Sequence, residues 1–329
     1  MESMGQSFQR KIIPATLFTV IIFLFLFIDF IDVGALLPSS YKSIHVMFLS
    51  IILEAIPFIL LGVFVSSLIQ VFITEDMVRK YIPHNPIIAI FPAALLGAIF
   101  PVCECAIVPI VRRLMKKGVP LHVGVVFLVG GPILNPVVFA STYYAFQTNT
   151  QIAYARMGLA FVLSMVIGFI IYLLFENKQQ LKESTTLEHS HHHHQNKWLS
   201  MFHHASDEFF DMGKYLIMGA FITSVFQVTI DRTTLSSIGN SEFFAPLLMM
   251  GLAFILSLCS EADAFVASSF AHVFSSTSLL AFLVYGPMID LKNTILLFAY
   301  YKKKFVFTLI GVITVVVYGS VLLYGTIFG

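Results

Sequence analysis

A short motif of thiols and an acid interrupts an otherwise apolar stretch of the chain. Cys103, Glu104 and Cys105 lie inside the segment GAIFPVCECAIVP, which runs from Gly97 to Pro109. Thiolates are soft ligands that select soft metals or metalloids, and an ionisable side chain in a membrane-type apolar segment indicates a functional site. The motif therefore predicts a binding site for a soft, thiol-reactive substrate, where the carboxylate exchanges protons as the site fills and empties.

The spacing of the two cysteines predicts a broken helix. Side chains two residues apart point in widely separated directions on a helix but share a face on an extended segment. Pro101 and Pro109 fit a chain that breaks at the cysteines and restarts as a short helix, because proline removes a helical donor and clashes with the preceding turn. At membrane depth such backbone is tolerated only where it is buried in protein or lines a cavity. The alternative is a proline-kinked helix with two inert buried thiols.

A second motif, SLCSEAD from Ser257 to Asp263, also puts a thiol beside acids. Cys259, Glu261 and Asp263 are candidate substrate ligands, and three converging thiolates would suit a trivalent soft centre. Ser260 and Asp263 also have the spacing of a helix-capping box, so Asp263 either binds substrate or caps the returning helix. For Cys259 alone, the alternative is an inert buried cysteine.

Two proline-containing motifs interrupt later segments at matching places. GGPILNP contains Asn135, and GPMID contains Asp290. Each break adds backbone carbonyls and one polar side chain to the predicted cavity, or else is a packing kink with a satisfied polar group. Asp290 and Lys292 are interpreted as a structural pair, since long basic side chains snorkel or pair with acids. Glu54, before Pro57, is interpreted as a proton site or an interfacial residue.

The composition places the chain in a membrane. Hydrophobic residues make up 58% of the 329 residues and charged residues 11%, whereas soluble domains average about a quarter charged. A net charge of +1 without a basic, aromatic-interleaved patch argues against nucleic acid as a partner. The sequence has no nucleotide-binding or serine-hydrolase motif, so it is predicted to be neither an ATP-driven pump nor an enzyme, and no cofactor is expected.

Nine apolar segments define the predicted organisation. They run approximately over residues 12–31, 44–73, 87–111, 120–146, 154–175, 209–230, 244–270, 278–299 and 304–327. We predict an all-α polytopic protein with an N-terminal anchor helix in residues 1–43, a first membrane repeat in 44–175, a cytoplasmic linker in 176–206 and a second membrane repeat in 207–329.

The two halves of the chain repeat each other, and such internal similarity defines the unit of the fold. At one constant offset Gly62, Ser67 and Gln70 match Gly219, Ser224 and Gln227. When the offset is shortened by one residue, Cys103 matches Cys259, and when it is shortened by a second residue, Asn135 matches Asp290. Three matching stretches in the same order make coincidence an unsatisfactory explanation.

The distribution of lysine and arginine sets the predicted topology, because cytoplasmic loops are enriched in them. Suppose that 87–111 and 244–270 are re-entrant hairpins with tips at the cysteines. Nearly all basic residues then become cytoplasmic, and only Lys42, Arg156 and Arg232 remain at or near the outside. Each repeat has three spanning helices and one hairpin, which inverts the second repeat relative to the first. Inverted repeats with interrupted segments place substrate sites near the midplane, so the two hairpin tips are expected to meet there.

A histidine tract lies in the linker and contains His191, His192, His193 and His194. Imidazole suits zinc, copper and nickel, so the tract is a candidate metal collector. The interpretation we favour is a solvated linker whose histidines reflect compositional bias.

Three stretches, PVCECAIVPIVRRLMKKGVP, GGPILNPVV and SLCSEADAFVASSF, resemble the ArsP-like permease family. The resemblance covers both repeats. It implies a permease that binds a methylated or aromatic trivalent arsenical through cysteine thiols and releases it outward in exchange for protons. The family's cysteine motif falls on Cys103 and Cys105, and its second-half motif on Cys259, Glu261 and Asp263. The resemblance also allows a small membrane protein as a partner subunit.

The leading hypothesis is a multi-pass secondary permease of the plasma membrane that exports a soft, thiol-reactive substrate. In this hypothesis Cys103, Cys105 and Cys259 hold the small-molecule or metalloid substrate near the midplane of the lipid bilayer. A second hypothesis is a transporter for a divalent metal such as zinc, with the histidine tract as collector. A third is a non-transporting membrane subunit of a complex.

Overall fold

The structure is a computed structural model that describes residues 39–72, 74, 76–78, 85–99, 103–175, 180–182, 197–229 and 243–328. The predicted anchor helix at 12–31 and the tract from His191 to His194 lie outside these residues. Hypotheses about those two segments therefore stay predictions.

The described residues form helices, with no β-strand among them. In chain order the helices are α2 (Ser39–Phe72), α4 (Pro86–Ile99), α5 (Glu104–Lys116), α6 (Leu121–Gly130), α7 (Pro136–Ala145), α8 (Gln151–Phe175), α9 (Lys197–Thr229), α11 (Phe244–Leu256), α12 (Ala262–Ser269), α13 (Ser276–Met288), α14 (Leu291–Tyr300) and α15 (Lys303–Phe328). The predicted all-α class is confirmed for this part of the chain.

Within the described ranges, five helical stretches are long and apolar enough to cross a membrane. They are Tyr41–Gln70, Gln151–Phe175, Glu208–Thr229, Ser276–Tyr300 and Lys303–Ile327. Each coincides with one of the predicted spans. The predicted span at 120–146 is divided into α6 and α7, because the backbone leaves the helix between Gly131 and Asn135. Ser276–Tyr300 is likewise interrupted, between the end of α13 at Met288 and the start of α14 at Leu291. The multi-pass membrane prediction is therefore supported at the level of individual helices.

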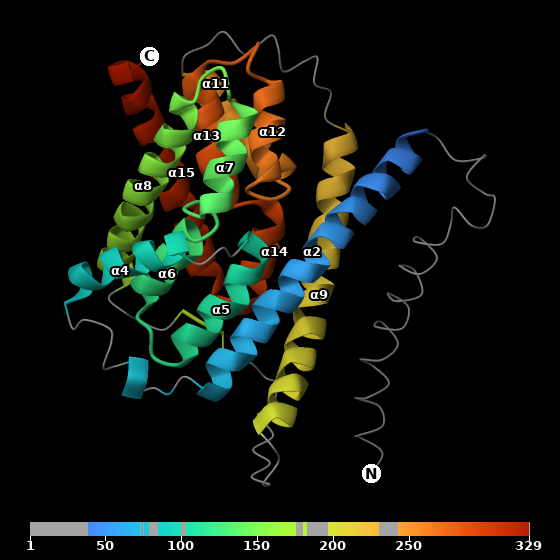
Figure 1. Cartoon of the computed structure of the whole chain (residues 1–329), viewed down its shortest axis with the longest axis vertical. Helices are drawn as coiled ribbons and strands as arrows, with labels where there is room; N and C mark the ends of the chain where they lie inside the picture. The colour runs from blue at the N-terminus through green and yellow to red at the C-terminus, as the bar shows by residue number, and fades with distance from the viewer. Residues whose placement is uncertain are drawn as a thin grey trace.

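The same order of elements occurs twice. One long helix, two short helices, an interrupted pair and another long helix appear as α2, α4, α5, α6 with α7, and α8, and again as α9, α11, α12, α13 with α14, and α15. In Figure 1, α11 and α12 lie toward the upper end of the molecule, and α4, α5 and α6 lie below them. This arrangement accords with the internal repeat; the inverted, re-entrant membrane topology stays a prediction.

Both cysteine motifs fall at breaks between helices. The first break separates α4 from α5 and contains Cys103, whose backbone is extended with φ −72° and ψ 165°. The second break separates α11 from α12 and contains Cys259. A continuous kinked helix through the first motif is therefore excluded, and the predicted restart as a short helix is confirmed.

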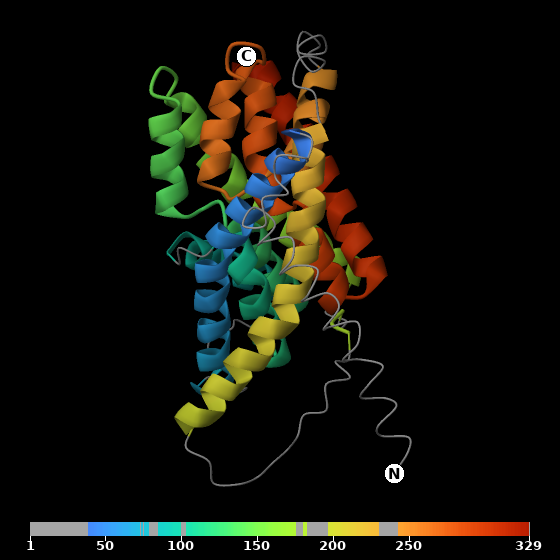
Figure 2. The ribbon, with the colours of Figure 1, turned by 90° about the vertical axis from the view of Figure 1, so that its right-hand side faces the viewer.

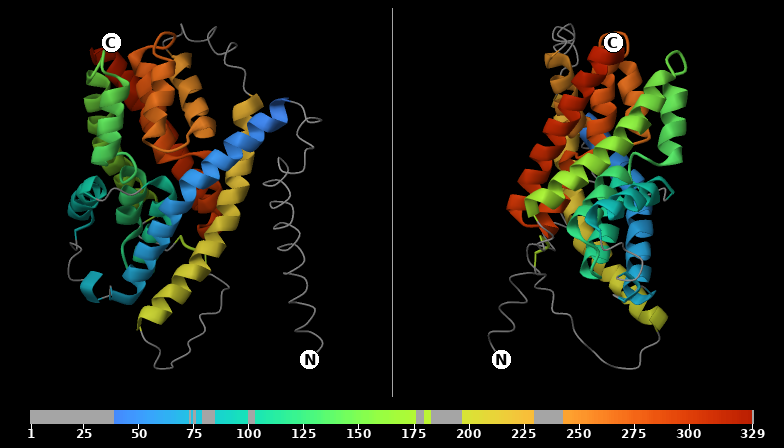
Figure 3. Two further views of the ribbon diagram at one scale, coloured as in Figure 1. Left: turned by 45° about the vertical axis from the view of Figure 1, so that its right-hand side comes forward. Right: turned by 90° about the vertical axis from the view of Figure 1, so that its left-hand side faces the viewer.

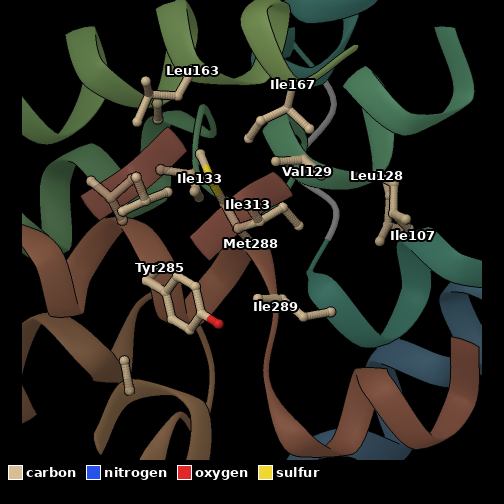
Figure 4. Packing of buried hydrophobic residues seen from close by; sticks show 14 of the residues in the cluster. Ile107, Leu128, Val129, Ile133, Leu163, Ile167, Tyr285, Met288, Ile289 and Ile313 are labelled. Atoms are coloured by element: carbon tan, nitrogen blue, oxygen red, sulfur yellow. The ribbon is translucent and has the colours of Figure 1, made fainter. Parts of the chain in front are cut away.

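The core is built around α13. All of its side chains from Ser278 to Met288 are buried. Met288 lies among Ile133, Ile167 and Ile313 (Figure 4). These three side chains come from the turn between α6 and α7, from α8 and from α15. Apolar side chains from both halves of the chain thus meet at the point where α13 ends.

Two long helices, α2 and α9, lie side by side and cover the two cysteine breaks (Figures 2 and 3). A glycine on each permits close packing. A Cβ added to Gly62 would lie 2.6 Å from the Cβ of Ala106 in α5, and one added to Gly219 would lie 3.2 Å from the Cα of Lys292 in α14. Because these two matched glycines lack a side chain, the long helices can pack directly against α5 and α14 near the cysteines.

Candidate functional site

A small cavity of about 20 Å³, enough for about one water molecule, lies between the two cysteine breaks. Its lining comes from α2, α9, both breaks and the first turn of α14, and comprises Ile51, Glu54, Ala55, Phe58, Cys103, Glu104, Cys105, Leu216, Leu258, Cys259 and Lys292. The three cysteines of the chain thus line one space.

The first break brings two thiols to the cavity. The carbonyl of Cys103 accepts hydrogen bonds from the amides of Ala106 and Ile107, at 3.1 Å each, so the residue starts α5 while its own backbone stays extended. Cys105 already lies in the first helical turn. Because one residue is extended and the next are helical, both side chains reach the same space, which a continuous helix would not allow. Glu104, between them, is 1% exposed.

Asp263 holds the second break together. Its carboxylate accepts hydrogen bonds from the hydroxyl of Ser257 at 2.6 Å and from the amide of Leu258 at 3.1 Å. The predicted capping pair of Ser260 and Asp263 is wrong, because α12 begins only at Ala262 and the acid reaches back to the end of α11. Asp263 is fully buried and its oxygens are occupied by the protein itself.

Cys259 meets groups from two helices. Its sulfur accepts the amide of Ala262 at 3.4 Å, and the carboxyl group of Glu54 in α2 lies within hydrogen-bonding reach of its thiol. Glu261 precedes α12 as its N-terminal flanking residue, makes no capping bond and is partly exposed. Of the two acids, Glu54 is the one that lines the cavity.

Asn135 and Asp290 are helix caps. The Asn135 side chain accepts a hydrogen bond from the amide of Val137 at 2.7 Å, and the Asp290 side chain accepts one from the amide of Asn293 at 2.6 Å. Both residues are buried. For Asn135 the geometry therefore favours the satisfied packing kink, whereas Asp290 has a further ionic contact.

The ionic contact of Asp290 is with Lys292, which supplies the positive charge at the cavity. The sequence motifs did not place Lys292 there. Its ammonium lies 3.4 Å from a carboxylate oxygen of Glu104 and 3.4 Å from one of Asp290. It also donates a hydrogen bond to the carbonyl of Leu258, and its side chain is 3% exposed. One buried ammonium therefore joins the first break, the second break and the start of α14.

The count of basic residues placed Arg156 only by side of the membrane, at or near the outside, and gave its side chain no partner. Arg156 is fully buried in α8, and its guanidinium donates to the carbonyl of Leu283 at 3.1 Å, the hydroxyl of Thr142 at 2.6 Å and the carbonyl of Ser260 at 3.0 Å. The count treated basic residues as loop markers. Broken helices, however, leave backbone carbonyls that need hydrogen-bond donors inside the protein. The guanidinium group of arginine supplies five N–H donors.

A second charged cluster lies outside the cavity. The buried carboxylate of Glu208 in α9 accepts hydrogen bonds from the hydroxyl of Ser66 at 2.8 Å and from Arg113 at 3.1 Å, and Arg112 lies 3.8 Å away. The Arg112 guanidinium also stacks on the ring of Tyr300 at 4.0 Å. The cluster ties α2, α5, α9 and α14 together, whereas the sequence suggested only that these arginines face the cytoplasm.

The thiols do not converge on a point. Among the residues that the structure describes, no three side chains of His, Cys, Asp or Glu are placed to hold a metal ion. The cavity therefore offers three separated thiols, one ammonium and two carboxyl groups within an apolar lining.

Comparison with known proteins assigns the chain to a family. The chain matches the ArsP_1 family of predicted permeases over residues 40–328, which includes both cysteine breaks and both interrupted helix pairs. The chain belongs to this family.

Its relatives include the UPF0718 protein YcgR of Bacillus subtilis, which is 49% identical over 87% of this chain and 99% of its own length. A Streptococcus mutans protein that is named as a subunit of a two-component membrane permease complex is 40% identical over 85% of this chain and 94% of its own length. No solved structure matches the chain. Membership of this family of predicted permeases, together with the five apolar helices found in the part of the chain that the structure describes, indicates a multi-pass membrane protein.

Proposed function

We propose that this permease exports a soft, thiol-reactive substrate by secondary transport, and that its substrate class is the trivalent organoarsenicals. The observation that carries the proposal is the single cavity lined by Cys103, Cys105 and Cys259 from both helix breaks. Thiolates bind soft centres. Apolar lining residues such as Ile51 and Phe58 suit an organic substituent better than a hydrated ion.

The chemistry of thiol binding separates an arsenical from a divalent metal. A trivalent arsenical with two hydroxyl groups forms two As–S bonds with two thiols, and each thiol proton leaves with a hydroxyl group as water, so no net proton is released. A divalent cation that binds the same two thiols must displace their protons, because the thiolate is the ligand. Proton release on binding therefore tells the two substrates apart.

A binding titration on the purified protein tests the proposal. We expect trivalent methyl- or phenylarsenical to bind with a heat that does not depend on the ionisation enthalpy of the buffer, and the Cys103→Ser/Cys105→Ser variant to lose this binding. Met218→Leu is the control, because Met218 carries a soft sulfur on the exposed face of α9. Undiminished binding by the double variant, or binding of zinc alone with proton release, would contradict the proposal.

The separation of the thiols implies a movement. Because no three described side chains of His, Cys, Asp or Glu are placed to hold one metal ion, all three thiols can bind a single arsenic atom only if the cysteine breaks move toward one another. In this proposal, substrate binding draws together the start of α5 and the start of α12. Such a change at the junction of two repeats is how alternating access operates around a fixed site.

The proposed topology is a pair of inverted repeats, residues 44–175 and 207–329, joined by a cytoplasmic linker in 176–206. In this topology Lys116, at the end of α5, and Lys303, at the start of α15, face the same side of the plasma membrane. Labelling of intact cells and everted vesicles with a membrane-impermeant amine reagent tests it. Reaction of the two lysines from opposite sides would overturn the inverted arrangement.

The name of the Streptococcus mutans relative supports a partner subunit for this chain as well. Purified chain in liposomes tests whether it is needed. Transport by the chain alone would show that it is a complete permease, whereas substrate binding without transport would indicate that a second membrane protein completes it. Absence of both would favour a non-transporting role.

A further inference from the structure

Five fully or nearly fully buried ionisable side chains surround the two cysteine breaks. Three are acids, Glu104, Asp263 and Asp290, and two are bases, Arg156 and Lys292; none is more than 3% exposed. If all five were ionised, the buried cluster would carry one uncompensated negative charge. Such a charge is costly inside a membrane protein, and a buried carboxyl group avoids the cost by binding a proton.

The contacts indicate which acids share that proton. Asp263 has both oxygens occupied, by Ser257 and Leu258, and it interacts electrostatically with Arg156 and Lys292. Two carboxyl groups, Glu104 and Asp290, are left with one ammonium between them. Lys292 lies 3.4 Å from each.

The geometry of these two acids fits a shared proton. Glu104 and Asp290 lie within hydrogen-bonding reach of each other. Among the described residues, Oε2 of Glu104 has no hydrogen-bond partner, and Oδ2 of Asp290 has only the ion pair with Lys292 at 3.4 Å. Two carboxylates cannot bond to each other without a hydrogen, since both are acceptors. One proton turns the contact into a hydrogen bond and removes the excess charge.

We propose that Glu104 and Asp290 form a proton-binding site, with Lys292 as its fixed counter-ion, directly beside the cysteine cavity. The site joins the two halves of the chain, because Glu104 lies in the first turn of α5 and Asp290 caps α14. Glu54 and Glu261, the other acids near the breaks, are partly exposed and do not need this proton for charge balance. Movement of α5 away from α14 in the transport step that follows substrate binding separates the pair and releases the proton, which couples proton movement to the substrate site; this coupling rests on the proposed function.

The chain offers a matched variant that preserves the fold. Asp290→Asn keeps a side-chain oxygen that can cap α14, as Asn135 caps α7 at the equivalent position of the first half. It removes the acid from the pair but not the cap. Asp211→Asn is the control, because Asp211 is a partly exposed acid paired with Lys214 away from the cavity.

Infrared spectroscopy of the purified protein in lipid at neutral pH tests the proton site without any substrate. We expect the carbonyl stretch of a protonated carboxylic acid, sensitive to deuterium oxide, in the wild-type protein and in Asp211→Asn, and its loss in Asp290→Asn and in Glu104→Gln. Persistence of the full band in both site variants would overturn the proposal.

Transport distinguishes a failure of this site from a failure of the proposed function. In vesicles with an imposed pH gradient, we expect Asp290→Asn to bind the arsenical through its cysteines but to lose gradient-driven accumulation. Gradient-driven accumulation equal to wild type would overturn the proton site and leave the substrate assignment standing. Failure of the wild-type protein to bind arsenical would overturn the substrate assignment, while the infrared band would still decide the proton site.

Discussion

Asn135 and Asp290 cap corresponding helices in the two halves of the chain, one with an amide and the other with an acid. Asn135 accepts a hydrogen bond from the second residue after it, at 2.7 Å, and Asp290 accepts one from the third, at 2.6 Å. The acid additionally lies 3.4 Å from the ammonium of Lys292. The two halves thus share a structural device, and only the second half adds a charge to it.

Loss of the neutral cap should cost stability without affecting the charge of the site. We expect Asn135→Ala to lower the free energy of unfolding by about 1 kcal/mol, because a capping oxygen is removed, and Asn135→Ser to restore most of it. Thermal unfolding of the purified protein in detergent measures both. Equal midpoints for Asn135→Ala and wild type would show that the Asn135 bond does not stabilise α7.

Close packing of α2 against α5 makes Gly62 sensitive to a single methyl group. The added Cβ of Gly62→Ala would lie 2.6 Å from the Cβ of Ala106, and overpacking of this kind costs about 1–3 kcal/mol. Gly213→Ala in α9 is the control, since an added Cβ there meets nothing within 4 Å and alanine favours a helix by about 0.5–1 kcal/mol. Opposite shifts in the unfolding midpoint are expected, and a stabilising Gly62→Ala would contradict the packing.

The buried guanidinium of Arg156 should be essential for the second break. Arg156→Met leaves the carbonyls of Leu283 and Ser260 without this donor, at about 1–3 kcal/mol each, and Arg156→Lys recovers only part because it lacks the planar fork. Lys214→Met is the control, because the exposed pair with Asp211 contributes about 0–1 kcal/mol. The unfolding midpoint and the yield of monodisperse protein should follow this order, and an unaffected Arg156→Met would refute the assignment.

The number of thiols that a substrate needs should follow its number of organic substituents. A trivalent arsenic atom without substituents can bond three thiols, and one with a single methyl or phenyl group can bond two. We therefore expect Cys259→Ser to weaken binding of arsenite by at least about tenfold, or 1.4 kcal/mol, and to weaken binding of a singly substituted arsenical less. Competition titrations measure both affinities. A larger loss for the substituted compound would contradict three-thiol binding of arsenite.

Much of the architecture follows from local sequence signals. Proline and polar residues inside apolar stretches predicted where the helices break, because such residues cannot continue a helix in lipid without compensation. The cysteine motifs and the interrupted pairs at Asn135 and Asp290 were found this way, whereas the five spans were predicted from long apolar runs. The boundary of α12 was not predicted correctly. The motif therefore paired Asp263 with Ser260, whereas the structure shows a hydrogen bond between Asp263 and Ser257.

The charged contacts of the site could not be predicted, because they depend on how distant segments pack. Lys292 and Glu104 are separated by 188 positions, and the local spacing suggested only a pair with Asp290. Arg156 was assigned no partner, since nothing in the sequence around α8 indicates that carbonyls of the second break need a donor. Long-range electrostatics of this kind follows the tertiary structure and is not visible in any one motif.

Uptake into everted membrane vesicles tests the central claim most directly. Vesicles that contain the wild-type protein or Met218→Leu should accumulate a trivalent methylarsenical, and vesicles with the Cys103→Ser/Cys105→Ser variant at equal abundance should not. Zinc should accumulate in none of them. Accumulation of the arsenical by the double variant at the wild-type rate would contradict a substrate site built from the cysteines of the two helix breaks.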